Sequence, residues 1–198
     1  HMSALNKMTI RDVDVAGKKV IIRVDFNVPL DANLNITDDN RIQGAVPTIK
    51  YLIENKAKVI IMSHLGRPKG EFKSEFSLKP AAARLSELLG QEVILANDVV
   101  GEDAFAKVSA LTEGHVVMLE NLRFHKEEEK NDPGFAKKLA SMADLYVNDA
   151  FGTAHRAHGT TAVIADYFPA DKRMFGFLIN SELAAMDRVL NNAQHPFT

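Results

Sequence analysis

The stretch KVIIRVDFNVPLD, residues 19–31, combines a buried strand with a polar end. Three apolar residues follow the opening lysine, and polar side chains then occupy every second position, at Arg23, Asp25 and Asn27. Because side chains alternate across a strand, these polar residues share one face. Pro29 cannot donate a ladder hydrogen bond, so we expect strand pairing to end near it. The polar face then lies at the carboxyl end of the strand, where open α/β sheets bind ligands. A structural ion pair between Arg23 and Asp25 is the alternative explanation.

Apolar runs and helical patterns alternate along the rest of the chain. Further apolar runs that suit buried strands begin near residues 59, 92, 115, 144 and 173. Between them, apolar residues recur at the three- and four-residue spacing of amphipathic helices. The predicted helices cover 36–56, 77–90, 102–111, 133–143 and 180–192. This alternation predicts an α/β fold: a doubly wound, mostly parallel, Rossmann-like sheet with helices on both faces.

Local signals indicate where the first two helices begin and end. Thr37 or Asp38 is a candidate cap for the first helix. Ser77 is a candidate cap for the second, which Gly90 should end. Pro47 lies inside the first helical pattern, where proline lacks an amide hydrogen and clashes with the preceding turn. We therefore expect Pro47 to kink or divide that helix.

Composition excludes several classes of function. The chain has 198 residues, which suits one domain or one domain with part of another. Its formal net charge is -2 and its pI about 6.4, so no global positive field would recruit nucleic acid or a membrane. The absence of cysteine excludes disulfides, thiolate catalysis and cysteine-based metal sites. No apolar run is long enough to span a bilayer, and no signal-peptide pattern opens the chain.

Polar and basic residues follow most of the predicted strands. In a parallel sheet the loops after the strands leave from the same edge, so these side chains should converge there, together with Arg41 at the start of the first helix. The residues concerned are Asp25 and Asn27 after the first strand, His64, Arg67 and Lys69 after the second, Arg123 and His125 after the fourth, and His155, Arg156 and His158 after the fifth.

Convergent arginines indicate an anionic ligand. Arginine presents a planar fork that matches phosphate and carboxylate oxygens, and several arginines in one place repel each other unless an anion is bound. Asp25 and Asn27 can exchange hydrogen bonds with a hydroxyl group. The residues therefore predict a small, hydroxylated, multiply anionic metabolite, although any one of these arginines taken alone is explained as a solvated surface residue.

Other motifs argue against alternative chemistries. His155 and His158 have a spacing that suits a metal, but no carboxylate pair or third ligand accompanies them, so no metal site is predicted. The run KEEEK, residues 126–130, is expected to form a solvated helix or loop face. The chain contains no G-x-x-x-x-G-K-[ST] or G-x-G-x-x-G motif, so a nucleotide site is not indicated. It also lacks the G-x-S-x-G motif of many hydrolases.

Four motifs in order along the chain closely resemble those of the phosphoglycerate kinase family: RVDFNVP, SHLGRPKG, LENLRFHKEEE and NDAFGTAHRAH. The resemblance extends from about Met8 to the end of the chain. It implies a substrate, 3-phosphoglycerate or 1,3-bisphosphoglycerate, for the anion site. It also implies a cytoplasmic enzyme, monomeric at full length, in which hinge closure between two α/β domains permits phosphoryl transfer.

The resemblance implies that this chain is the N-terminal domain of such an enzyme. Residues 3–178 would form the 3-phosphoglycerate-binding domain, and residues 179–198 an interdomain helix with the lead-in to a second domain. Mg-ATP or Mg-ADP would bind to that absent domain, so no cofactor or metal is expected here. Phosphate or sulfate could occupy the basic patch. The chain alone is expected not to turn over, and apolar surface on its final helix could drive dimerisation.

The same resemblance assigns roles to individual residues. Asp25 and Asn27 would hydrogen-bond the glycerate hydroxyl. Arg41 would be the catalytic residue, close to the transferred group, where it would stabilise charge on the phosphoryl oxygens. A basic patch would complete the substrate site, with its arginines mainly holding the 3-phosphate; its members are His64, Arg67, Arg123 and Arg156.

Two further hypotheses and one departure accompany this interpretation. A non-catalytic binding module for a small anionic metabolite would use the same residues. A nucleic-acid binder is ranked last, because the chain has neither a basic excess nor a recognisable motif. The family often has a Lys-Glu pair at the start of the interdomain helix, whereas this chain has Asn180, Ser181 and Glu182. Hinge contacts built on that lysine are therefore not carried over.

Overall fold

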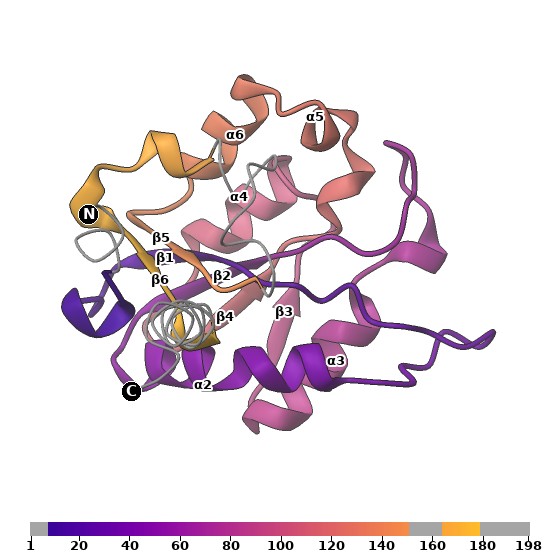
Figure 1. Ribbon diagram of the computed structural model, residues 1–198, viewed down its shortest axis with the longest axis horizontal. Helices are drawn as coiled ribbons and strands as arrows, with labels where there is room; N and C mark the ends of the chain where they lie inside the picture. The colour runs from indigo at the N-terminus through magenta and orange to yellow at the C-terminus, as the bar shows by residue number, and fades with distance from the viewer. Residues whose placement is uncertain (1–7, 151–163, 179–198) are drawn as a thin grey trace, which may run out of the picture.

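The fold is a six-stranded parallel sheet with helices on both faces (Figure 1). The structure, a computed structural model, describes residues 8–150 and 164–178 of the chain. The strand order is β3-β4-β2-β1-β5-β6, and every paired strand among the described residues runs parallel. The strands are β1 Lys19–Arg23, β2 Lys58–Met62, β3 Val93–Leu95, β4 Val116–Met118, β5 Leu145–Asn148 and β6 Arg173–Phe175. The predicted doubly wound α/β class is confirmed.

Helices cover the two faces of the sheet in separate groups (Figure 1). The helices are α2 Asn40–Glu54, α3 Lys79–Leu89, α4 Glu102–Ser109, α5 Lys126–Glu129 and α6 Pro133–Ala140. Apolar residues of α2 and α3 belong to one buried cluster, and those of α4 and α6 to another. Short 3-10 turns lie between these elements, at Ile10–Asp12, Ser74–Phe76, Leu122–Phe124, Ile164–Tyr167 and Ala170–Lys172.

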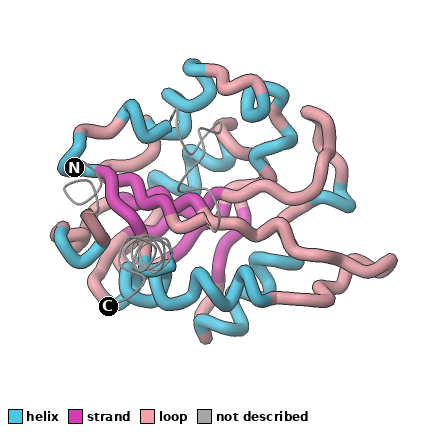
Figure 2. Tube along the Cα trace, viewed as in Figure 1, coloured by secondary structure: helices cyan, strands magenta, loops and turns pink. Residues whose placement is uncertain are grey.

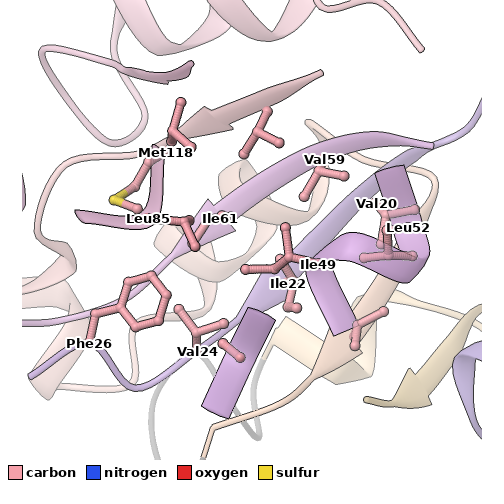
Figure 3. Close-up of a cluster of buried hydrophobic side chains, with 14 of the residues drawn as sticks. Val20, Ile22, Val24, Phe26, Ile49, Leu52, Val59, Ile61, Leu85 and Met118 are labelled. Atoms are coloured by element: carbon pink, nitrogen blue, oxygen red, sulfur yellow. The ribbon is translucent and has the colours of Figure 1, made fainter. Parts of the chain in front are cut away.

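The central strand shows how the sequence fills both faces. Ile22 belongs to the cluster under α2 and α3, whereas its neighbour Ile21 belongs to the cluster under α4 and α6, and both are fully buried. Figure 3 shows Ile22 and Val24 in the first cluster, close to Ile49 of α2. A run of consecutive apolar residues is expected of a parallel strand that is covered on both faces.

Helix α2 forms as its apolar spacing predicts, but it starts later than expected and Pro47 does not divide it. Its first residue is Asn40 and its N-cap is Asp39, one residue after Asp38 and two after Thr37, the predicted caps. Asp38 instead accepts a hydrogen bond from the Asn40 amide at 2.9 Å. Pro47 does not divide the helix, which runs without interruption from Asn40 to Glu54. The buried face of α2 packs on the sheet throughout, and this tertiary packing outweighs the cost of the proline.

Helix α3 begins and ends close to the predicted positions. Gly90 ends it in the left-handed conformation, with φ of 70°, and its amide donates to the Ser86 carbonyl. The N-cap is Leu78, not Ser77, but the Ser77 hydroxyl accepts from the Lys79 amide at 3.1 Å. Ser77 therefore satisfies an amide of the first turn from one position before the cap.

The strand order places the reversal of the sheet at β1. The chain passes from β1 to β2 on one side, and it later returns to β5 on the other side of β1. In open α/β sheets the crevice at such a switch point, outside the carboxyl ends of the strands, is the usual ligand site. Figure 2 shows long loops leaving the strands on the right of the view, where the carboxyl end of β1 lies.

Some expectations concern residues that the structure does not describe. The predicted helix over 180–192 and the departure at Asn180 lie outside the described ranges. Within the described residues, no helix is long and apolar enough to cross a membrane.

Candidate functional site

The predicted site lies at the carboxyl ends of β1, β2 and β4, where three loops meet. After Arg23 the chain leaves the ladder, although we expected pairing to continue to near Pro29. The Val24 amide still donates to the Met62 carbonyl at 3.1 Å. Side chains then replace the ladder, because the Phe26 amide donates to Ser63 Oγ at 2.9 Å. The strand ends early because these side-chain acceptors satisfy its amides.

The alternation of the opening stretch survives beyond the end of the strand. Val24 and Phe26 are fully buried, whereas Asp25 and Asn27 are half-buried. Figure 3 shows Phe26 in the cluster beneath the sheet. The polar and apolar residues therefore point in opposite directions, as the spacing predicted, and the apolar ones anchor the loop that carries the polar ones.

Arg41 connects the first turn of α2 to this loop. Its NH1 donates to Asp25 Oδ1 at 3.2 Å and to the Asn27 carbonyl at 2.9 Å. The Asn27 amide also donates to Asp25 Oδ1, at 3.1 Å. The Arg41 side chain is 50% exposed, so it remains within reach of a ligand. The three residues predicted to hold the hydroxyl and the transferred group are thus brought together.

The loop after β2 is tied to the same group. Asn27 Oδ1 accepts from the Gly66 amide at 2.9 Å. Gly66 has φ of 60°, and a Cβ at this position would lie 2.5 Å from the Phe76 ring, so a side chain does not fit. Arg67 follows directly and is exposed. The Asn27 side chain therefore fixes the loop that presents Arg67.

Asn121 holds the third loop against the second, and sequence analysis missed it. Its side chain is fully buried and accepts from the amides of Leu65 and Arg123, at 3.1 and 3.0 Å. It donates to the carbonyls of Leu65 and Phe76, at 2.7 and 2.9 Å. Arg123 is half-buried, and its Nε has no hydrogen-bond partner in the described part of the chain. An amide between an acid and a leucine in LENLRF was the only available signal.

Glu120 was also missed, and its role is structural. It is buried and accepts from Ser77 Oγ at 2.5 Å and from the Leu78 amide at 2.9 Å. A carboxylate from the loop after β4 therefore anchors the start of α3. Nothing in the spacing of Glu120 distinguishes this role from that of a surface acid.

Arg23 does not pair with Asp25, contrary to the alternative explanation of the opening stretch. Arg23 and Asp25 are two positions apart, but the Arg23 NH1 lies 3.3 Å from Glu128 Oε2. The side chains of Arg23 and Glu128 are each 5% exposed. Asp25 pairs with Arg41 instead. The expectation of a solvated 126–130 run is therefore wrong at Glu128, although its neighbours Glu127 and Glu129 are exposed.

Arg23 also contacts His64 from the neighbouring strand. Its NH2 lies 3.3 Å from His64 Nδ1. The register aligns Arg23 with Met62, so His64, two residues later, is on the same face. Tyr146 of β5 is buried nearby: burial raises the pKa of its hydroxyl, Arg23 opposes that rise, and Glu128 adds to it. The buried charges of Arg23 and Glu128 therefore lie beneath the loops at the carboxyl edge of the sheet.

A separate pocket lies beside the start of α2. It has a volume of about 450 Å³ and is lined by Ile36, Thr37, Asp38, Asp39 and Arg84. Arg84 Nε donates to Asp39 Oδ2 at 2.7 Å, which holds the pKa of the Asp39 carboxyl below its usual value. The charge of this arginine is already matched, so the pocket does not favour an anion as the loop edge does.

Part of the predicted basic patch cannot be placed. Arg156, together with His155 and His158, lies outside the described residues. His125 is half-buried and its Nδ1 lies 3.8 Å from Glu127 Oε1. Among the described residues, no group of three or more histidine, aspartate or glutamate side chains is arranged to hold a metal ion.

Comparison with known proteins identifies the family. A sequence model described as phosphoglycerate kinase matches residues 10–198. Phosphoglycerate kinase of Chlorobium limicola is 54% identical over 193 residues, covering 98% of this chain and 48% of the relative. The cytosolic phosphoglycerate kinase 3 of Arabidopsis thaliana is 56% identical over 189 residues, covering 96% of this chain and 46% of the relative. The chain thus spans about half the length of the curated relatives it matches.

The solved structures agree with the sequence match. The structure of phosphoglycerate kinase from Coxiella burnetii has a TM-score of 0.81 and 42% identity, and the alignment covers 92% of this chain and 44% of that one. The enzyme from Pyrococcus horikoshii also gives a TM-score of 0.81, at 37% identity, with coverage of 91% and 45%. With the match over residues 10–198, these similarities show that the chain belongs to the phosphoglycerate kinase family.

Proposed function

We propose that this chain is the substrate-binding half of a phosphoglycerate kinase. The complete enzyme would transfer a phosphoryl group reversibly between 1,3-bisphosphoglycerate and ADP, giving 3-phosphoglycerate and ATP. The observation that carries the proposal is the contact network at the end of β1. There Asp25, Asn27 and Arg41 join one another and the Gly66 loop. The chain alone would bind 3-phosphoglycerate without transferring phosphate.

Hydrogen-bonding capacity in the network suits a hydroxylated acid. Asp25 Oδ1 already accepts from Arg41 and Asn27, whereas no hydrogen bond within the described residues uses Asp25 Oδ2. Oδ2 can therefore accept from the glycerate hydroxyl. The buried, unpartnered Nε of Arg123 and the exposed Arg67 offer donors for the 3-phosphate, a role in which we also include Arg156 and His64.

Arg41 is the residue that we assign to catalysis. Its guanidinium is anchored by one nitrogen, NH1, to Asp25 and the Asn27 carbonyl, and half of the side chain is exposed. The remaining donors can face the acyl-phosphate and stabilise charge that develops on the transferred group. No covalent intermediate is required, because positioning, charge stabilisation and exclusion of water suffice for this transfer.

We assign substrate binding and nucleotide binding to separate halves of the enzyme, as the family resemblance implies. Residues 3–178 would be the 3-phosphoglycerate-binding domain and residues 179–198 the connection to the nucleotide half. That half would bind Mg-ATP or Mg-ADP. Phosphate or sulfate would compete for the basic patch, and the complete enzyme would be a monomer. We propose a cytoplasmic location, supported by relatives from Arabidopsis thaliana and Nicotiana tabacum that are named cytosolic.

A nuclear magnetic resonance titration tests the binding proposal. The isotope-labelled chain is titrated with 3-phosphoglycerate and, separately, with Mg-ADP and with inorganic phosphate. We expect 3-phosphoglycerate to shift the amides of Asp25, Arg41, Arg67 and Arg123, and Mg-ADP to leave them unchanged. Phosphate should shift Arg67 and Arg123 but not Asp25. If 3-phosphoglycerate at millimolar concentration shifts none of these signals, the proposal is wrong.

A coupled assay tests the turnover proposal separately. The chain is incubated with 3-phosphoglycerate and Mg-ATP, and 1,3-bisphosphoglycerate is detected by its reduction with NADH in the presence of the appropriate dehydrogenase. We expect no activity above the background without protein. Turnover by the purified 198-residue chain would contradict the assignment of the nucleotide site to a separate half.

A further inference from the structure

We propose that Arg23 is a positioning residue that holds the His64 imidazole as the neutral tautomer with its proton on Nε2. We further propose that Glu128 fixes Arg23 for this role. The inference rests on the proposed function for the identity of the ligand, and it deepens that function. It assigns to His64 the part of a neutral hydrogen-bond donor at an edge where the arginines supply the charge.

The contact between Arg23 and His64 determines where the proton lies. Arg23 NH2 and His64 Nδ1 are 3.3 Å apart. A guanidinium has five N–H donors and no acceptor, and it stays charged in proteins. Nδ1 must therefore accept through its lone pair, and the single proton of a neutral ring lies on Nε2. An imidazolium would instead direct an N–H group at the guanidinium and add a second positive charge beside it.

Arg23 is also held by an ion pair. Its NH1 lies 3.3 Å from Glu128 Oε2, and both side chains are almost completely buried. Arg23 is the last residue of β1, in register with Met62 of β2 and Asn148 of β5, so its backbone is fixed by the sheet. The guanidinium cannot turn away from His64 without weakening a buried ion pair.

The consequence concerns how the site recognises an oxygen. A phosphate or carboxylate oxygen accepts hydrogen bonds, and a ring with its proton on Nε2 carries one N–H donor and no charge. Arg67 and Arg123 can supply the charge that balances the ligand. In this arrangement His64 supplies a neutral hydrogen-bond donor and the arginines supply the positive charge. The arrangement also gives a reason for the burial of Glu128 in a run of otherwise exposed charged residues.

The tautomer can be read directly in the ligand-free chain. Two-bond proton–nitrogen correlation spectra distinguish the two ring nitrogens of each histidine, and His64→Gln assigns the His64 signals among the seven histidines. We expect Nδ1 to resonate as an unprotonated acceptor and Nε2 as a protonated nitrogen at neutral pH. A proton on Nδ1, or the shifts of an imidazolium, would overturn the proposal.

A double variant tests whether Arg23 is the cause. Arg23→Met combined with Glu128→Leu removes both charges, so that neither is left buried and unpaired. We expect the preference for the Nε2 proton to be lost and the two nitrogen shifts to move toward each other. Glu129→Gln, an exposed position of the same helical turn, is the matched control and should leave both shifts unchanged.

The outcomes separate this inference from the proposed function. If the double variant keeps the wild-type nitrogen shifts, Arg23 does not set the tautomer and the inference is wrong. The wild-type spectrum decides the tautomer even where the double variant fails to fold. Because this spectrum is recorded without ligand, a failure of 3-phosphoglycerate to bind overturns the function alone, whereas binding with a proton on Nδ1 overturns the inference alone.

Discussion

Arg41 is the residue whose removal should separate catalysis from binding most clearly. It contacts Asp25 and Asn27 through NH1 and its side chain is half exposed, although its removal takes the ion-pair partner from Asp25, whose side chain is 19% exposed. In a full-length kinase that contains this chain, we expect Arg41→Ala to lower kcat by about 10³-fold, a typical effect for an arginine that stabilises a transferring phosphoryl group. The Kd for 3-phosphoglycerate, measured by titration calorimetry, should rise only about tenfold.

Arg173→Ala is the matched control for Arg41. Arg173 opens β6 at the amino edge of the sheet, away from the carboxyl-end loops, and its NH1 donates to the Ala165 carbonyl. The Arg173 variant should keep the wild-type kcat and Kd. An Arg41→Ala enzyme with unchanged kcat would show that this arginine does not act on the transferred group.

Arg84 should control the acid titration of Asp39. Its hydrogen bond is the largest cause of the lowered Asp39 pKa, whose usual value is 3.8. A carboxyl with a lowered folded-state pKa stabilises the fold above its unfolded pKa, and that contribution disappears as pH falls through the folded value. Arg84→Met should therefore raise the Asp39 pKa. The variant should then lose less folding stability than the wild type as the pH falls below about 4. Carbon-13 carboxyl titration measures the pKa directly.

Asp103 is the internal control for that titration. Its pKa is also lowered, chiefly by a hydrogen bond from Lys107, and neither residue contacts Arg84. The Asp103 titration should be identical in the wild type and in Arg84→Met. A matching rise at both carboxyls would point to a general change in the fold and against the local ion pair.

Some residues of the site could be predicted from sequence and others could not, for a physical reason. The meeting of Asp25, Asn27 and Arg41 at one edge of the sheet was predicted, because strand alternation and a helix start are local patterns. The predicted partner of Arg23 was wrong, because Glu128 is 105 residues away and one of five adjacent charged residues. Asn121 acts through backbone groups of the segment between β2 and α3, and no spacing rule encodes such contacts.

At the scale of elements, the order and type of the strands and helices followed from hydrophobic period, whereas several boundaries did not. β1 ends at Arg23, well before Pro29, because Ser63 replaces the ladder as a hydrogen-bond acceptor. α2 contains Pro47 without a break, because its buried face packs on the sheet. In both cases a tertiary contact outweighs the local sequence preference for where the element ends or breaks.

Glycine 44 gives a test of helix propensity in α2. Gly44 lies inside the helix, and a Cβ there would meet only Leu178 carbons at 3.8 Å or more. Gly44→Ala should therefore raise the free energy of unfolding by about 0.5–1 kcal/mol, since alanine favours the helix and restricts the unfolded chain. Urea unfolding followed by circular dichroism measures the change.

Gly66→Ala should have the opposite effect on stability from Gly44→Ala. Gly66 has a positive φ, and its added Cβ would clash with the Phe76 ring. We expect this variant to lose stability and to disturb the Asn27 contact at the site. If Gly44→Ala were as destabilising as Gly66→Ala, helix propensity would not be what limits α2.

At the scale of the whole molecule, the sheet joins two hydrophobic cores into one cooperative unit. Cluster residues from α2 and α3 lie on one face and those from α4 and α6 on the other. Adjacent residues of every central strand contribute to opposite clusters, and Figure 3 shows the alternate residues that face one of them. Neither core can lose its packing without exposing the strands that the other core needs.

This arrangement makes a prediction for neighbouring residues of β2. Ile60 and Ile61 are both fully buried, but Ile60 faces the α4 and α6 cluster and Ile61 the α2 and α3 cluster. Ile60→Ala and Ile61→Ala should each lower the free energy of unfolding by about 2–5 kcal/mol, because each removes buried methyl groups and leaves a cavity. Urea unfolding should remain a single transition with an unchanged m value in both variants.

The decisive comparison is between probes on the two faces. Tyr146 reports on the α4 and α6 side and Tyr51 on the α2 side, so their assigned ring resonances can follow each core separately during unfolding. In both variants the two signals should be lost at the same urea concentration. If Ile60→Ala released Tyr146 while Tyr51 kept its native signal, the α4 and α6 layer would unfold independently, and a single sheet would not be enough to make the two cores cooperative.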